Sequence, residues 1–266
     1  MPPGKKMQTG FAFSKFADRL SKLAELSTDD MSLLAAMPSA ISHYASHETV
    51  LRAGEHTRHC CLLLQGYLCW RSASCGQIIS IHVPGDIPDL SSYQLQPVGA
   101  DLASLGTAVV ALVPHPYFRE ISARSPNLSR ALFLLTLADA SALQNWVVNL
   151  GSRDALTRVA HLVCDIAARL WAMGLAKDLT FPSPFTQADL ASICGISPVH
   201  ANRVVQELRR KGVLQWEART IVITEWHALA RIANFRPDYL LLRNAAMVLP
   251  GHAQAELEQA RFAIDA

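Results

Sequence analysis

Two helix-start signals follow one another closely in the C-terminal half of the chain, and they constrain its fold more than any other feature. Thr186 and Asp189 form an acidic variant of the capping box, in which a hydroxyl and a carboxylate satisfy free N–H groups at a helix start. Ser197-Pro198 supplies a second N-cap, with proline at the first helical position. Gly195 lies between the two, where the chain must turn left-handed. The spacing predicts a helix, a short turn and a second helix, which is the helix-turn-helix arrangement.

The second helix of this pair is predicted to have two unlike faces. At about 100° per residue, its small apolar residues gather on one side and its amide and guanidinium groups project from the other. Side-chain amides pair with adenine in the major groove, and guanidinium groups pair with guanine. We therefore expect the outward face to read DNA bases, with a merely solvated surface as the alternative. The base-reading candidates are Val199, Asn202, Arg203 and Gln206.

The stretch around the second helix is basic, and a β-hairpin follows it. Residues 199–219 hold five Lys and Arg against two Glu, a net charge of +3. Residues 212–216 and 220–224 predict the two strands of a wing. Helix starts, basic helix ends and wing tips are suited to phosphate contacts. The candidates for phosphate contact are Thr186, Ser197, His200, Arg209, Arg210, Lys211, Arg219 and Thr220.

The charge of the whole chain hides this local excess. The 266 residues carry 24 Lys and Arg against 22 Asp and Glu, a net charge of +2, which excludes a protein coated in positive charge. Half of the residues are hydrophobic, so the chain has material for a folded core. No secretory segment and no run of about 18 apolar residues occurs, so we expect a cytoplasmic protein without a membrane partner. Its six cysteines fit reduced thiols.

The N-terminal half has a different character. Residues 14–37 have helical periodicity, and residues 41–113 consist of short apolar runs separated by turn residues, including Gln65-Gly66. The fold class expected is α+β, with an N-terminal antiparallel β-roll, a long dimerisation helix and a C-terminal winged helix-turn-helix. The expected domains are 1–24 for an N-terminal tail and helix, 25–125 for a sensor domain, 126–150 for a dimerisation helix, 151–240 for a DNA-binding domain, and 241–266 for a C-terminal tail.

Residues 126–150 predict a helix that is apolar around most of its circumference. Such a helix must be covered on two sides. The β-roll would cover one side and a second copy of the helix the other, while a helix central to one monomeric core is the alternative. The residues expected at the dimer interface are Leu128, Leu132, Leu135, Ala138, Ala142 and Trp146.

The order of these parts resembles the Crp/Fnr family of bacterial transcription regulators over about residues 25–240. The most specific stretch is Phe185–Leu214, and Gly54-Glu55 and Val83–Asp86 look like turns of the family's cyclic-nucleotide-binding-like roll. The resemblance implies a homodimer on double-stranded DNA, a near-palindromic operator with half-sites about one helical turn apart, and RNA polymerase as a partner. Val199 departs from the glutamate that family members with a well-known site carry there.

No cofactor is expected. Cyclic-nucleotide binding needs a cation for the phosphate, yet no Arg or Lys occurs between residues 72 and 118, so cyclic AMP is not expected. Relatives with an iron–sulfur cluster carry closely spaced cysteines near the N-terminus, and this chain has none before Cys60. The histidines in the first 60 residues are interpreted as ordinary strand and turn residues, so no metal site is expected.

Two other classes of function compete with DNA binding. One is a signalling module that binds a small molecule or a protein without touching DNA, and the charges around residues 199–219 argue against it. The other is an enzyme, but the sequence contains no nucleophile elbow, P-loop, dinucleotide fingerprint or metal-protease helix. We therefore expect no catalytic residues.

Overall fold

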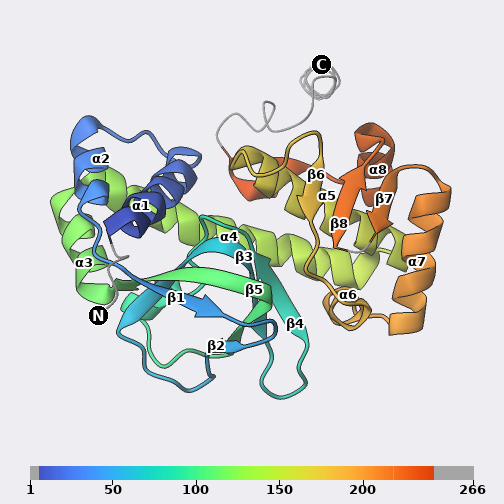
Figure 1. The fold of residues 1–266 in the computed structure, drawn as a ribbon, viewed down its shortest axis with the longest axis horizontal. Helices are drawn as coiled ribbons and strands as arrows, with labels where there is room; N and C mark the ends of the chain where they lie inside the picture. The colour runs from blue at the N-terminus through green and yellow to red at the C-terminus, as the bar shows by residue number, and fades with distance from the viewer. Residues whose placement is uncertain (1–5, 218, 243–266) are drawn as a thin grey trace. The chain divides into compact units, whose positions relative to one another are not determined.

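The computed structural model describes residues 6–217 and 219–242 (Figure 1). Its fold class is α+β, with an antiparallel sheet in the N-terminal part, long helices and a C-terminal helix-turn-helix, as the sequence predicts. The chain divides into two compact units. The first holds the described residues up to Ala140 together with Pro184–Gly195; the second holds Ser141–Ser183 and the described residues from Ile196 onward. The C-terminal tail, expected at 241–266, lies almost wholly outside the described residues.

The first unit is built on an antiparallel sheet. Its order is β1-β5-β3-β4, with β2 paired to β5 beside β1. Apolar runs separated by turn residues form such strands because each strand buries side chains and each turn reverses the chain. The strands are β1 Ala40–Tyr44, β2 Thr49–Leu51, β3 His59–Arg71, β4 Ile78–His82 and β5 Asp101–Pro114.

The predicted turn at Gln65-Gly66 is wrong, because β3 runs through it as one strand. Its pairing with β5 shifts register on both sides of Gln65, which is the pattern of a β-bulge. Gly66 has a φ of 80°, and a Cβ at this position would lie 2.1 Å from the Thr107 carbonyl oxygen. Glycine at this point therefore bends a continuous strand instead of ending it.

Helices cover the end of this sheet (Figure 1). They are α1 Lys6–Ser21, α2 Thr28–Ala35 and α3 His115–Arg124. The helical periodicity expected over 14–37 corresponds to two helices, because Ser27 and Asp30 form a capping box that starts a new helix. Phe16 and Phe118 pack edge to face at 6.2 Å in the core between helices and sheet.

The long helix α4 spans Pro126–Ser152, and its buried face holds four of the six residues expected at the dimer interface. Leu128, Leu132, Leu135 and Ala138 are at most 4% exposed and belong to the core of the first unit. These four residues have no surface left for a partner, so their assignment to the interface is wrong. Ala142 and Trp146 are half-buried. The helix α4 is long and apolar enough to cross a membrane. Length and composition are weak evidence for a membrane span here, because one face of α4 is packed in a folded core.

The second unit contains the rest of the C-terminal part. Its elements are α5 Ala155–Ala172, β6 Thr180–Pro182, α7 Pro198–Arg210, β7 Leu214–Glu217, β8 Thr220–Ile223, α8 Trp226–Ala233 and the short 3-10 helix η2 Pro237–Leu240. The three strands form a sheet in the order β6-β8-β7. The helix α5 packs against α7 and α8. The third strand, β6, was not predicted.

The helix α6, Gln187–Cys194, belongs to the first unit, although the sequence places it in the DNA-binding domain at 151–240. Two hydrogen bonds join it to the edge strand β4 and to the residue before that strand. The Ile78 N–H donates to Ser192 Oγ at 3.0 Å, and the Gln77 amide donates to the Ser192 carbonyl oxygen. Contacts between residues this far apart in the chain are not visible in the sequence pattern.

Candidate nucleic-acid interface

The first predicted helix start has the geometry of a capping box. Thr186 Oγ1 accepts from the Asp189 N–H at 3.1 Å, and Asp189 Oδ2 accepts from the Thr186 N–H at 2.9 Å. The threonine hydroxyl also donates to that carboxylate at 2.7 Å. Gly195 ends α6 with a φ of 61°, in the left-handed region that favours glycine. The prediction for this segment is confirmed.

The second helix start is confirmed as well. Ser197 Oγ accepts from the His200 N–H at 3.2 Å, and Pro198 stands in the first turn of α7. Both cap hydroxyls already accept a hydrogen bond from a backbone N–H of the helix that they cap. A phosphate contact by Thr186 or Ser197 would therefore add to an existing hydrogen bond of that hydroxyl. The free N–H groups of the first turn of α7 remain suited to an anion.

The helix α7 has the two faces that its sequence predicts. Ala201, Val204 and Leu208 are buried, which anchors the helix against α5 and β7. The four base-reading candidates, Val199, Asn202, Arg203 and Gln206, are all exposed, with Val199 63% exposed. Their amides and guanidinium group are presented to solvent on a rigid helix, which is what reading a DNA groove requires.

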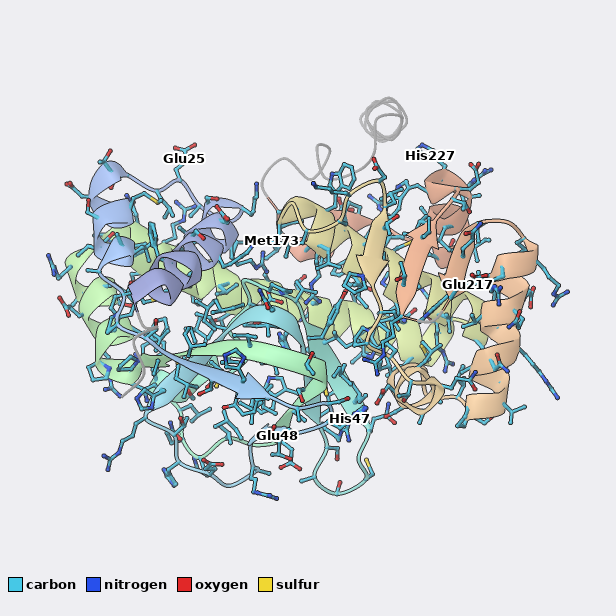
Figure 2. All side chains as sticks on the ribbon, viewed as in Figure 1. Glu25, His47, Glu48, Met173, Glu217 and His227 are labelled. Carbon is cyan, nitrogen blue, oxygen red and sulfur yellow. The ribbon has the colours of Figure 1, made fainter. Side chains whose placement is uncertain are left out.

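The basic residues of this region fall into two groups. Arg209 Nη2 lies 2.9 Å from Glu217 Oε1 on β7, where Figure 2 labels Glu217, and Lys211 Nζ lies 3.7 Å from Glu207 Oε1. Arg203 and Arg210 form no ion pair with any residue that the structure describes. Positive charge is thus available at Arg203 and Arg210, whereas Arg209 and Lys211 are partly neutralised.

The wing is a tight antiparallel hairpin. Glu217 pairs with Thr220 in the register of β7 and β8, and Arg219 lies beside this pair at the tip. Arg219 and Thr220 are exposed, while Ile221 is buried. Alternation between buried and exposed residues fixes which side chains face outward. The structure places Arg219 and Thr220 at the wing tip and His200 in the first turn of α7.

A polar cluster that the sequence did not predict ties η2 to α5. The Tyr239 hydroxyl donates to Asp165 Oδ1 at 2.6 Å, and Arg169 Nη1 lies 3.2 Å from the other oxygen of that carboxylate. His161 stacks on Tyr239 with ring centroids 5.9 Å apart. Burial lowers the pKa of His161 to about 4, so this ring is neutral at physiological pH. The cluster braces the helix that supports α7.

The segment that follows Gly85-Asp86 contains a buried acid. Asp89 is 1% exposed, and its Oδ1 accepts from the Cys61 N–H at 2.7 Å. Burial raises the pKa of Asp89 to about 6. This carboxyl lines a cavity of about 210 Å³ with Trp70 and residues 95 and 97–100. No cation lines that cavity, and no cluster of three metal-ligating side chains occurs within residues 6–217 and 219–242.

Comparison with known proteins identifies a domain family and several relatives. A model of the Crp-like helix-turn-helix domain matches residues 157–232. This chain is similar to the transcriptional activator protein FnrL of Cereibacter sphaeroides, with 26% identity over 166 residues, 61% of this chain and 66% of that protein. It is 22% identical over 158 residues to the fumarate and nitrate reduction regulatory protein of Escherichia coli K12, covering 59% of this chain and 63% of the relative. The chain thus spans just under two thirds of each relative.

Solved structures share the fold. FixK2 from Bradyrhizobium japonicum aligns with a TM-score of 0.66 and 20% identity, covering 74% of this chain and 98% of that one. A putative cAMP-binding regulatory protein from Silicibacter pomeroyi aligns with a TM-score of 0.57 and 16% identity, and the alignment covers 86% of this chain and 100% of that one. At this level of identity the likeness concerns the fold.

Proposed function

We propose that the chain is a transcription regulator of the Crp/Fnr family that binds specific sites on double-stranded DNA and is not an enzyme. One observation carries the proposal: the exposed face of α7. Asn202, Arg203 and Gln206 are held outward by a buried apolar face on the same helix. In the proposed complex the amides read adenine, Arg203 reads guanine, and Val199 contacts a thymine methyl group.

Phosphate contacts would surround these base contacts. Arg210 offers a charge that no described residue neutralises, and Arg219 and Thr220 offer the wing tip. Thr186, Ser197 and His200 stand at helix starts, where N–H groups favour an anion. Arg209 and Lys211 would contribute less, because each must leave a glutamate to reach a phosphate.

We propose that the protein is a homodimer joined through the exposed face of α4. Phe133 and Val147 are 62% and 70% exposed, and with the exposed Ala140 they recur every seven residues. Leu137 and Leu143 flank them, each 40% exposed. A seven-residue apolar repeat is the pattern of two helices packed side by side. A second copy is favoured over lipid because the opposite face of α4 is packed in a folded core.

The dimer would recognise a near-palindromic operator whose half-sites lie about one helical turn apart. RNA polymerase is the proposed protein partner, and the cytoplasm is the proposed compartment. The effector pocket is proposed to be altered, because the acid-lined cavity at Asp89 repels a phosphate. Neither cyclic AMP nor an iron–sulfur cluster is expected to bind, and calorimetry with cyclic AMP tests the first expectation.

Selection of bound fragments from genomic DNA, followed by a salt titration on the recovered site, tests the proposed function. We expect one palindromic motif and a steep fall of log K with log salt, because basic residues release counterions from DNA. Arg203→Gln should lose affinity for the motif, whereas Arg231→Gln, on the exposed side of α8, is the matched control. Recovery of no motif, with no dependence on salt, would instead indicate a signalling module that does not touch DNA.

A further inference from the structure

A second cavity of the first unit has the opposite charge to the one at Asp89. It has a volume of about 340 Å³ and lies beside η1, the short 3-10 helix Leu90–Tyr93. Small-molecule sites are commonly of this size. It is lined by Thr57, Arg58, Ser92, Tyr93, Gln94, Gln96, His115, Pro116 and Arg119.

Two arginines line this cavity, and no acidic residue does. Arg58 precedes β3, and Arg119 lies on α3. Neither forms an ion pair with any residue in the described part of the chain. The stretch from 72 to 118 contains no Arg or Lys, so both cations come from outside it and are brought to the cavity only by folding.

The polar wall of the cavity is held in place by internal hydrogen bonds. Gln96 bridges two segments: its Oε1 accepts from the Thr57 N–H at 3.2 Å, and its Nε2 donates to the Thr57 and Ser92 carbonyl oxygens at 3.0 and 2.6 Å. Arg119 Nη2 donates to the Tyr93 carbonyl oxygen at 2.9 Å, which leaves its other N–H groups for a ligand. A wall fixed in advance lowers the entropy cost of binding.

His115 completes the wall with a neutral ring. Its Nε2 lies 3.0 Å from Ser92 Oγ. Burial lowers the pKa of His115, and the positive charge of Arg119 adds to this shift. The positive charge of the cavity therefore rests on Arg58 and Arg119.

We propose that this cavity binds a small anion, a phosphate or a carboxylate, between Arg58 and Arg119. Guanidinium groups hold both kinds of anion through paired charge-assisted hydrogen bonds. The site contains no residue of α7, and it does not depend on the proposed function. Binding can therefore be measured on the full chain without DNA.

Calorimetry with inorganic phosphate, pyrophosphate and succinate, each at constant ionic strength set with KCl, tests the proposal and distinguishes phosphate from carboxylate. We expect one saturable site per chain for at least one of these anions. Arg58→Gln and Arg119→Gln should each weaken it about 10- to 100-fold, since one hydrogen bond to a charged group contributes a factor of this size. Arg52→Gln changes an exposed arginine outside the cavity and should leave binding unchanged.

A chemical readout keeps the test valid should a variant fail to fold. In the wild-type chain, the bound anion should protect Arg58 and Arg119 from phenylglyoxal, while Arg52 stays reactive. Mass spectrometry of the modified peptides measures this. Absence of saturable binding by all three anions in the millimolar range, or binding that survives in the double variant, would overturn the proposal. Either result would leave the DNA-binding proposal untouched.

Discussion

At the scale of the residue, burial and pairing decide what identical side chains can do. Arg203 and Arg209 lie on the same helix, yet Arg209 is joined to Glu217 at 2.9 Å and Arg203 is exposed without an ion pair to any described residue. An unpaired guanidinium on a rigid helix can bind a base edge without first breaking a contact. Helical periodicity identifies both arginines as surface residues, but it does not show which of them is free to bind DNA.

We expect Arg203→Ala and Asn202→Ala each to cost about 1–3 kcal/mol of binding to the specific site, because each removes a base contact. Arg209→Ala should cost less and weaken specific and scrambled duplexes alike. Fluorescence anisotropy with both duplexes at one salt concentration measures this. Unchanged discrimination between the duplexes in both alanine variants of the first pair would contradict the assignment.

Asp89 should make folding stability depend on pH. The pKa of Asp89 rises from 3.8 to about 6 on folding. Between pH 3.8 and pH 6 the folded state therefore holds a proton on Asp89 that the unfolded state has released. Stability from this group is fully present at low pH and is lost as pH rises toward 6. Asp89→Asn should remove this dependence and stabilise the protein at neutral pH by roughly 1–3 kcal/mol. Urea unfolding of the wild-type chain and of Asp89→Asn at pH 5 and pH 7.5 measures this difference. An identical pH dependence in both proteins would refute the prediction.

At the scale of the element, single residues decide where helices and strands continue. Thr186, Ser197 and Gly195 set the ends of α6 and α7, and these ends agree with the sequence prediction because capping is local chemistry. Gly66 shows the limit of this reasoning. A glycine beside a glutamine has the signature of a turn, and only the approach of β5 shows that it is a bulge within β3.

A comparison of two glycines in the first unit distinguishes the effect of steric crowding from the effect of backbone strain. Gly66 and Gly76 have φ values of 80° and 71°, so alanine at either position pays roughly 1–2 kcal/mol for a left-handed backbone. Only at Gly66 would the new Cβ meet the Thr107 carbonyl oxygen; at Gly76 nothing lies within 4 Å. Gly66→Ala should therefore be the more destabilising by about 1–3 kcal/mol in urea unfolding. Equal losses would argue against the bulge.

At the scale of the whole molecule, the two faces of α4 determine whether the protein is a monomer or a dimer. One face holds Leu128, Leu132 and Leu135 in the core of the first unit. The other face exposes the large apolar side chains of Phe133, Leu137 and Val147. Periodicity shows that both faces are apolar, but it does not show which face packs into the core of its own protomer.

Phe133→Glu combined with Val147→Glu should convert the proposed dimer into monomers, because it places charge in the apolar contact between two helices. Ala123→Glu, at an exposed position of α3, adds a charge away from this face and should leave the dimer intact. Sedimentation velocity of the three proteins measures the change. A wild-type monomer, or a dimer that persists in the double variant, would refute the proposed interface.

The features that depend on neighbouring residues follow from the sequence: the caps of α6 and α7, the exposed amide and guanidinium face of α7, the wing, and the run of strands before α4. Capping, turn formation and helical periodicity act over a few residues, so they can be read from the chain. The tertiary structure alone decided the core face of α4, the pairing of Arg209 with Glu217, the continuity of β3, and the meeting of Arg58 with Arg119 around one cavity. Each of these depends on residues distant in sequence, and their encounter is set by packing of the whole fold.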